Sequence, residues 1–254
     1  MERVYLDHNA TTPLRAEARA AMVAAMDVVG NPSSVHAEGR AAKMLVERAR
    51  AQVAELVGCK PQQVVFTSSA TEAAALAVAQ KARHGGVFAA LPTEHDCLGV
   101  WSEVELASLQ GTSGAFSGRG ADAFMKVASE VSSGNEHRGG DALFALIAQS
   151  AANSETGITA QDGKVVGSGK IRALTGGTHQ YASICDITQL AGKMPVIYGS
   201  ETPSYAILSA HKLGGPKGVG ALINFTANDP EPMLRGGGQE MNRRSGTENI
   251  IGIA

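Results

Sequence analysis

The sequence has no apolar run long enough to cross a bilayer. Its longest apolar stretches, such as 143–148, are far shorter than the roughly 20 residues that a transmembrane helix needs. No cationic segment followed by an apolar stretch comes after the first methionine, because Asp7, His8 and Asn9 interrupt it at once. These absences predict a cytoplasmic protein with no membrane partner and no secretory leader.

The sequence also has little net charge and no closely spaced pair of cysteines. The 254 residues carry a formal net charge of −2 and a pI near 6.4, which gives no reason to expect a nucleic acid or an acidic membrane as partner. The three cysteines, Cys59, Cys97 and Cys185, lie far apart and form no CxxC pair. Neither a disulfide framework nor a structural zinc site is therefore expected.

Two nucleotide-binding motifs are missing as well. No GxGxxG sequence occurs, so the fingerprint of a dinucleotide-binding fold is absent. The glycine-rich run 214–220 lacks the Gly-Lys-Ser/Thr ending of the phosphate loop of nucleotide hydrolases. By its glycines alone, this run predicts no more than a turn.

Helical and apolar segments alternate along the chain. Apolar residues recur at steps of three and four over 37–57, and Gly58 then ends the pattern, which predicts a helix. The alanine-rich stretch 70–81 predicts a second helix. Short apolar runs bounded by turn residues predict strands at 64–66, 87–91, 143–149, 181–185, 205–208 and 219–225.

Several of the predicted strands are apolar at every position rather than at alternate ones. Such runs are typical of strands covered on both faces, as in parallel sheets. Strands separated by helices predict an α/β domain with a mainly parallel sheet, whose ligands bind beyond the carboxyl ends of the strands. Two stretches rich in small residues, 110–120 and 161–177, predict loops or irregular hairpins, and 248–254 predicts the start of an apolar helix.

Lys212 lies just after the predicted strand 205–208, with Ser209 and His211 close before it. Partial burial and a nearby cation lower the pKa of a lysine, and its free amine can then attack an aldehyde. Pyridoxal phosphate is an aldehyde cofactor of this kind. The alternative for a single lysine is an ordinary solvated side chain.

Other groups that pyridoxal phosphate needs also lie at the ends of predicted strands. Asp186 can hold the ring nitrogen protonated, and Gln189 can donate to the ring hydroxyl. The turn 67–72 precedes a helix, where backbone N–H groups bind phosphate, and His95 can cover the ring. Each has an ordinary alternative. Asp186 and the turn 67–72 can simply cap helices, and His95 can be a surface or core histidine.

Taken in order along the chain, these segments resemble the cysteine desulfurases of the class V aminotransferase family, which are pyridoxal-phosphate enzymes. The resemblance runs from Tyr5 to the last residue. The matching segments are 5–13, 30–36, 65–72, 93–95, 152–157, 186–195, 209–220, 236–240 and 244–249.

The resemblance implies the fold of type I pyridoxal-phosphate transferases, with a mainly parallel seven-stranded sheet flanked by helices. It implies an N-terminal segment over 1–15 and a cofactor-binding large domain over 16–254. The family's C-terminal small domain has no counterpart in the sequence.

The resemblance also implies roles for single residues. Lys212 is expected to bind the cofactor aldehyde covalently, and His95 to stack on the ring and move protons. Asp186 and Gln189 are expected at the ring nitrogen and ring oxygen, and Ser154 replaces an asparagine that contacts cofactor or substrate in relatives. The phosphate is expected on the backbone of Ala70 and on Thr71, Ser209 and His211.

Thr247 is expected to reach the phosphate of the neighbouring subunit, so the resemblance implies a homodimer. Arg235, Arg243 and Arg244 either form a solvated face or line the cofactor cleft of that dimer. Ser69 stands where relatives have glycine, which predicts strain if the turn requires a positive φ.

The family's nucleophilic cysteine and its substrate-binding arginine are not found. None of the three cysteines lies in a Gly-Ser-Ala-Cys-like loop. Cys97 is close to His95 in sequence, but a small buried side chain is the expected role for it, and Cys185 is expected in the core.

The family's reaction converts L-cysteine to L-alanine and transfers the sulfur through a cysteine persulfide to an acceptor protein. Without the nucleophilic cysteine, this chain is not expected to complete the transfer alone. Two alternatives stay open. One is another class V reaction, such as transamination or the cleavage of selenocysteine or a sulfinate, and the other is a cofactor-binding scaffold without catalysis.

Overall fold

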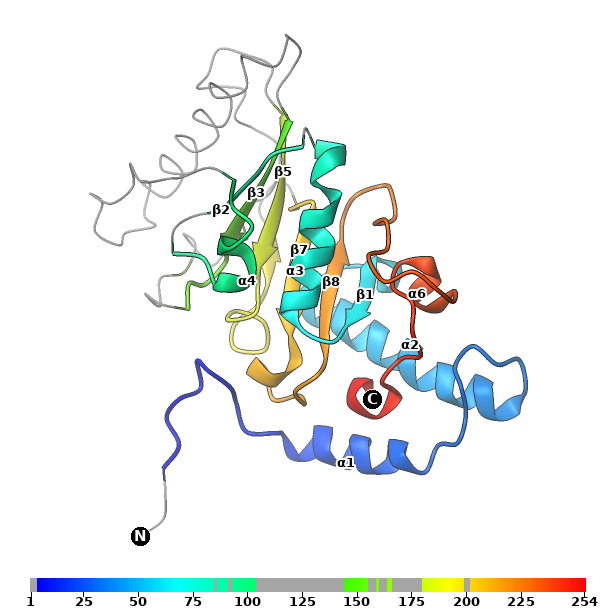
Figure 1. The fold of residues 1–254 in the computed structure, drawn as a ribbon. Helices are drawn as coiled ribbons and strands as arrows, with labels where there is room; N and C mark the ends of the chain where they lie inside the picture. Colours follow the sequence, from blue (N-terminus) through cyan, green and yellow to red (C-terminus); the bar gives the residue numbers. More distant parts are fainter. Residues whose placement is uncertain are drawn as a thin grey trace.

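The computed structural model describes residues 4–84, 86–90, 93–103, 144–154, 159, 164–165, 180–198 and 202–254. A six-stranded sheet forms the centre of the described part (Figure 1). The strands are β1 (Val64–Thr67), β2 (Phe88–Ala90), β3 (Phe144–Ser150), β5 (Gln180–Asp186), β7 (Tyr205–Ser209) and β8 (Gly220–Asn224). All six predicted strands are therefore confirmed.

The sheet has the order β1-β8-β7-β5-β3-β2. The pairs β2–β3, β3–β5 and β5–β7 are parallel, whereas β8 runs antiparallel to both of its neighbours. The predicted α/β architecture with a mainly parallel sheet is confirmed. Six strands form the sheet within the described ranges, against the seven that the resemblance implies.

A second, two-stranded sheet pairs β4 (Lys164–Val165) with β6 (Ile197–Tyr198). The stretch 161–177, expected to be irregular, thus contains one short strand. The rest of that stretch, apart from β4, and the whole of 110–120 lie outside the described residues.

Six α-helices lie within the described ranges, and three of them match the sequence patterns. The six helices are α1 (Ala16–Met26), α2 (Ala37–Val57), α3 (Ala70–Val78), α4 (Asp96–Gly99), α6 (Gln239–Asn242) and α7 (Ile250–Ile253). Gly58 ends α2 in the left-handed conformation, with a φ of 67° that costs glycine little. The expected helix 70–81 ends earlier, because its last turns tighten into the 3₁₀ helix Ala79–His84. The short α7 confirms the apolar helix start expected over 248–254.

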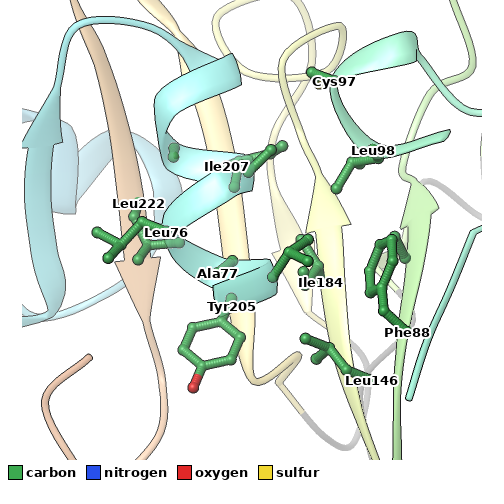
Figure 2. Packing of buried hydrophobic residues seen from close by; sticks show 14 of the residues in the cluster. Leu76, Ala77, Phe88, Cys97, Leu98, Leu146, Ile184, Tyr205, Ile207 and Leu222 are labelled. Carbon is green, nitrogen blue, oxygen red and sulfur yellow. The ribbon is translucent and has the colours of Figure 1, made fainter. Parts of the chain in front are cut away.

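The sheet separates two hydrophobic clusters, because alternate residues of a strand point to opposite faces. On one face, α3 and α4 pack against residues such as Leu146 and Ile184, and Figure 2 shows Leu76 and Leu98 in this cluster. On the other face, α2 packs against Phe66 and other strand residues. Both faces of the central strands are covered, as their continuous apolar runs predict.

A buried ion pair fastens the C-terminal part of the chain to this core. Arg50 on α2 donates to both carboxylate oxygens of Glu240, at 2.7 and 2.8 Å, and the two side chains are 3% and 1% exposed. Glu240 also accepts a hydrogen bond from the Phe66 backbone N–H at 2.8 Å. The pair holds three successive left-handed residues, Glu240, Met241 and Asn242, whose φ values are 49°, 58° and 65°. Such backbone is strained outside glycine and persists only where neighbouring contacts hold it.

We expect Glu240→Ala to lower the free energy of unfolding by about 3 kcal/mol, because it removes the buried carboxylate that accepts two hydrogen bonds from Arg50 and leaves the half-exposed Glu47 as the ionic partner of that guanidinium. Urea unfolding of the full chain measures this loss. Glu231→Ala is the matched control, since its partner Arg235 is 76% exposed, and we expect a loss below about 1 kcal/mol. Equal losses in the two variants would contradict a dominant role for the buried pair.

Candidate functional site

The predicted site residues meet at one edge of the sheet. Asp186 has Ser150 and Ile207 as its register partners, and Thr67 and Ser209 both pair with Gly220. Since β8 is antiparallel to both β1 and β7, these two strands run in the same direction and end at the same edge. Figure 1 shows the start of α3 at this edge, near the ends of β5 and β7.

The loop between β1 and α3 exposes the start of a helix. The first N–H groups of a helix have no partner within it, so those of Ala70 and Thr71 can donate hydrogen bonds to a bound anion. Ser69 caps the helix, with its Oγ accepting a hydrogen bond from Glu72 N–H at 3.2 Å. Its φ is −172°, an extended backbone, so the turn does not require a positive φ at Ser69 and no strain arises there. The glycine that this turn needs is Gly220, where a Cβ atom would lie 2.3 Å from the Ser69 backbone.

Three predicted residues follow one another at the end of β7. Ser209 is 4% exposed, and His211 and Lys212 are half-buried in the 3₁₀ helix Ala210–Lys212. His211 Nδ1 lies 3.1 Å from the Thr11 hydroxyl, and burial, then Lys212 and Lys217, lower the pKa of the imidazole. A neutral imidazole beside a half-buried lysine suits a site that receives an anion and exposes an amine.

Asp186 ends β5 with only 8% of its surface exposed. Its Oδ1 accepts a hydrogen bond from the Thr188 N–H at 2.8 Å, and across the described ranges no cation forms an ion pair with it. The buried Thr188 hydroxyl also has no hydrogen-bond partner within those ranges. Buried charge without a partner is unfavourable. A protonated ring nitrogen would supply the missing cation, so the site fits pyridoxal phosphate at this point.

Asn9 joins two of the predicted residues. Its Nδ2 donates to the Ser154 carbonyl at 3.0 Å, and its own carbonyl accepts from Gln189 Nε2 at 2.9 Å. Gln189 also accepts a hydrogen bond from Lys193. The sequence interpretation gave Asn9 no role, although it lies in the matching segment 5–13. The N-terminal segment is therefore packed against the candidate site.

His95 is exposed at the start of α4. Its Nδ1 accepts a hydrogen bond from the Cys97 N–H at 3.1 Å. A neutral imidazole that accepts at Nδ1 carries its proton on Nε2, so the outer edge of the ring is a donor. The preceding residue, Glu94, is 7% exposed and was also missed by the sequence interpretation, although the segment 93–95 belongs to the resemblance.

The three thiols are poor nucleophiles in this structure. Burial raises the pKa of Cys59 to about 11, and burial followed by the charge of Asp186 raises that of Cys97 to about 12. Cys185 is fully buried, and burial raises its pKa far above the usual value. The expected core positions of Cys97 and Cys185 are confirmed, and all three cysteines are free.

Thr247 is exposed and lines a cavity of about 100 Å³ together with Ser68 and Gly218. The segment that carries it is fixed to α3, because Arg244 donates to the Glu72 carboxylate at 2.8 and 3.3 Å. No contact within the described part of the chain joins Thr247 to Lys212.

The three arginines near Thr247 do not form one cluster. Arg235 is solvated and paired with Glu231. Arg243 is 2% exposed and donates to the backbone carbonyls of Gln62 and Val64. The expectation of a solvated face is therefore wrong for Arg243, because its guanidinium is buried and satisfies buried carbonyl groups.

Sequence comparison places the chain among known proteins. The family profile described as aminotransferase class-V matches residues 4–111. A cysteine desulfurase of Frankia sp. (strain EuIK1) is 38% identical over 274 residues, which cover 99% of this chain and 60% of that protein. A cysteine desulfurase of Klebsiella pneumoniae is 33% identical over 260 residues, which cover 100% of this chain and 60% of that protein. Part of the chain, residues 4–111, is thus similar to the class V aminotransferases, and nearly its whole length is similar to cysteine desulfurases.

Solved structures of this family have the same fold. The NifS-like protein from Rickettsia africae ESF-5 superimposes with a TM-score of 0.73 at 26% identity, covering 99% of this chain and 66% of that one. The type I fold implied by the resemblance is confirmed. The chain spans about 60% of the length of the curated relatives that it matches. Within the described ranges, no helix has the length and apolar character to cross a membrane, and no group of side chains is suited to a metal ion.

We expect all three thiols to react slowly with iodoacetamide at pH 7.5. With pKa values of about 11 and 12, Cys59 and Cys97 hold a thiolate fraction that is smaller than that of free cysteine by a factor of about 100 or more. Mass spectrometry of timed samples counts the modified cysteines, and the chain in concentrated urea is the control. Rapid labelling of one thiol in the folded chain would identify an activated cysteine and contradict this expectation.

Proposed function

We propose that this chain is the cofactor domain of a pyridoxal-phosphate-dependent cysteine desulfurase. The observation that carries the proposal is the shared sheet edge, at which a buried carboxylate without a cation, a half-buried lysine and an open helix start lie together. These three groups correspond to the ring nitrogen, the aldehyde and the phosphate of the cofactor. The names and identities of the relatives support the same activity.

Residues at the ends of different strands contact different parts of the cofactor. Asp186 on β5 holds the ring nitrogen, Lys212 after β7 binds the aldehyde, and His95 after β2 covers the ring. The phosphate lies at the other end of the edge, on the backbone of Ala70 and on Thr71, Ser209 and His211. When bound, pyridoxal phosphate supplies an electron sink for negative charge on the substrate carbon.

The remaining chemistry falls to side chains of this chain. The Lys212 amine takes and returns the proton of the substrate carbon, and the Nε2–H of His95 donates a hydrogen bond on the open side of the site. Ser154 and Gln189, both contacted by Asn9, border the substrate and the ring oxygen. The N-terminal segment over 1–15 therefore serves the site built by the large domain over 16–254.

The substrate in this proposal is L-cysteine, and the products are L-alanine and sulfur carried to an acceptor protein through a cysteine persulfide. The raised pKa values of Cys59, Cys97 and Cys185 exclude them as an activated nucleophile, so the attacking thiolate comes from outside the chain. The site is completed in a cytoplasmic homodimer, where the exposed Thr247 reaches the phosphate of the partner subunit.

We expect the purified chain, mixed with pyridoxal phosphate and reduced with borohydride, to carry the cofactor on Lys212. Peptide mass spectrometry locates the adduct. Lys212→Ala removes it, because Lys212 is the half-buried lysine that follows β7, whereas Lys217→Ala, an exposed lysine of the adjoining loop, retains it. An adduct on Lys212→Ala at the wild-type level would overturn the assignment of the lysine.

We expect the loaded chain, supplied with L-cysteine and a small thiol as sulfur acceptor, to release alanine and sulfide in equal amounts. The added thiol replaces the missing nucleophile, and Lys212→Ala abolishes the release. Amino-acid analysis and a sulfide assay measure the products. Cofactor binding without alanine, but with turnover of a sulfinate or an amino-group acceptor, would favour another class V reaction, which needs no cysteine. Binding with no turnover would favour a scaffold.

A further inference from the structure

Glu94 is a buried acid to which the proposed reaction assigns no role. Its Oε1 accepts a hydrogen bond from the Ser150 backbone N–H at 3.0 Å, and its Oε2 accepts one from the Ser150 hydroxyl. The carbonyl of the preceding Thr93 accepts a hydrogen bond from Asn153 Nδ2 at 2.8 Å. Thr93 and Glu94 thus attach the turn that carries His95 to the end of β3 and to the loop after it.

The same contact brings Glu94 close to Asp186. Ser150 and Asp186 are register partners on β3 and β5, and the charge of Asp186 acts on the Glu94 carboxyl group. Burial first, and Asp186 in addition, raise the pKa of Glu94 to about 7, although the hydrogen bonds from Ser150 act in the opposite sense. From α4, the Cys97 thiol faces both carboxyl groups, and Lys212 also acts on that thiol.

Two acids therefore share a small buried volume. Within the described ranges, no lysine, arginine or histidine forms an ion pair with either of them. Two buried like charges cannot both form without cost, so the Glu94 carboxyl group, with its raised pKa, is partly protonated near neutral pH. A cation that binds beside Asp186 offsets the negative charge there, and the pKa of Glu94 then falls.

We propose that Glu94 is a positioning residue of the cofactor site, a role that rests on the proposed function. Glu94 fixes the turn that carries His95 to Ser150 on β3. Its carboxyl group also adds negative charge beside Asp186, at the place proposed for the ring nitrogen. When a cationic ring nitrogen binds to Asp186, the proton of Glu94 leaves to solvent. The Ser150 hydroxyl serves both forms, because it can donate to the carboxylate and accept from the acid.

The test compares wild type with Glu94→Gln, which keeps the shape and an oxygen acceptor but cannot ionise. Equilibrium dialysis gives the Kd for pyridoxal phosphate between pH 6 and pH 8. The titrations of the cofactor and of Lys212 are common to both proteins, so the ratio of the two Kd values isolates Glu94. We expect the variant's Kd to exceed that of wild type by about 2-fold at pH 6 and by about 10-fold at pH 8.

Glu17→Gln is the matched control, because this acid is 83% exposed, and we expect its Kd ratio to stay at 1 throughout. A ratio for Glu94→Gln that does not change with pH overturns the proposal. In that case the proposed function stands, provided that wild type binds and Asp186→Asn weakens binding. Failure of wild type to bind the cofactor overturns both.

Thermal unfolding without the cofactor is an independent measurement. The pKa of Glu94 in the folded chain lies above the unfolded value, so the stability from its proton is present at low pH and lost as the pH rises through about 7. We expect the Tm of wild type to fall relative to that of Glu94→Gln between pH 5 and pH 8. A constant difference overturns the proposal.

Ser150→Ala is the second variant, needed if Glu94→Gln does not fold. It removes the hydroxyl hydrogen bond that lowers the pKa of Glu94. We therefore expect its profile of Kd against pH to be displaced to higher pH than that of wild type. An undisplaced profile overturns the proposal.

Discussion

The register of three parallel strands determines where the whole candidate site lies. Because β3, β5 and β7 run parallel, Ser150, Asp186 and Ile207 fall side by side, and the loops that follow leave from one edge. The antiparallel β8 brings β1, and with it the start of α3, to the same edge. A slip of one residue in the β5 pairing would turn Asp186 to the opposite face of the sheet.

Charge is buried in two different ways in this molecule. The Glu240 carboxylate is satisfied by the Arg50 guanidinium and a backbone N–H, and the result is a fixed conformation for the left-handed turn. Asp186 and Glu94 are buried together with no cation paired to them in the described ranges. The first arrangement serves stability. The second leaves an unfavourable interaction that a bound cation relieves, as expected where a site is built to receive one.

The candidate site also joins segments that are far apart in the chain. Thr11 contacts His211 across 200 residues, and Asn9 contacts Ser154 across 145. Such contacts form only after the sheet has closed, because each loop alone has no partner to order it. The residues proposed to hold the phosphate, the aldehyde and the ring nitrogen therefore depend on one folded edge rather than on a local motif.

Apolar periodicity and turn residues act locally, so they were enough to predict the six strands of the central sheet, the helices α2 and α3 and the α/β class. The ordered motifs of the sequence also pointed to the family and to Lys212, Asp186 and His95. Only the tertiary structure decided the roles of Glu94 and Arg243. Their burial depends on partners 56 and 179 residues away, and a charged residue in a sequence carries no sign of whether water or a buried carbonyl will surround it.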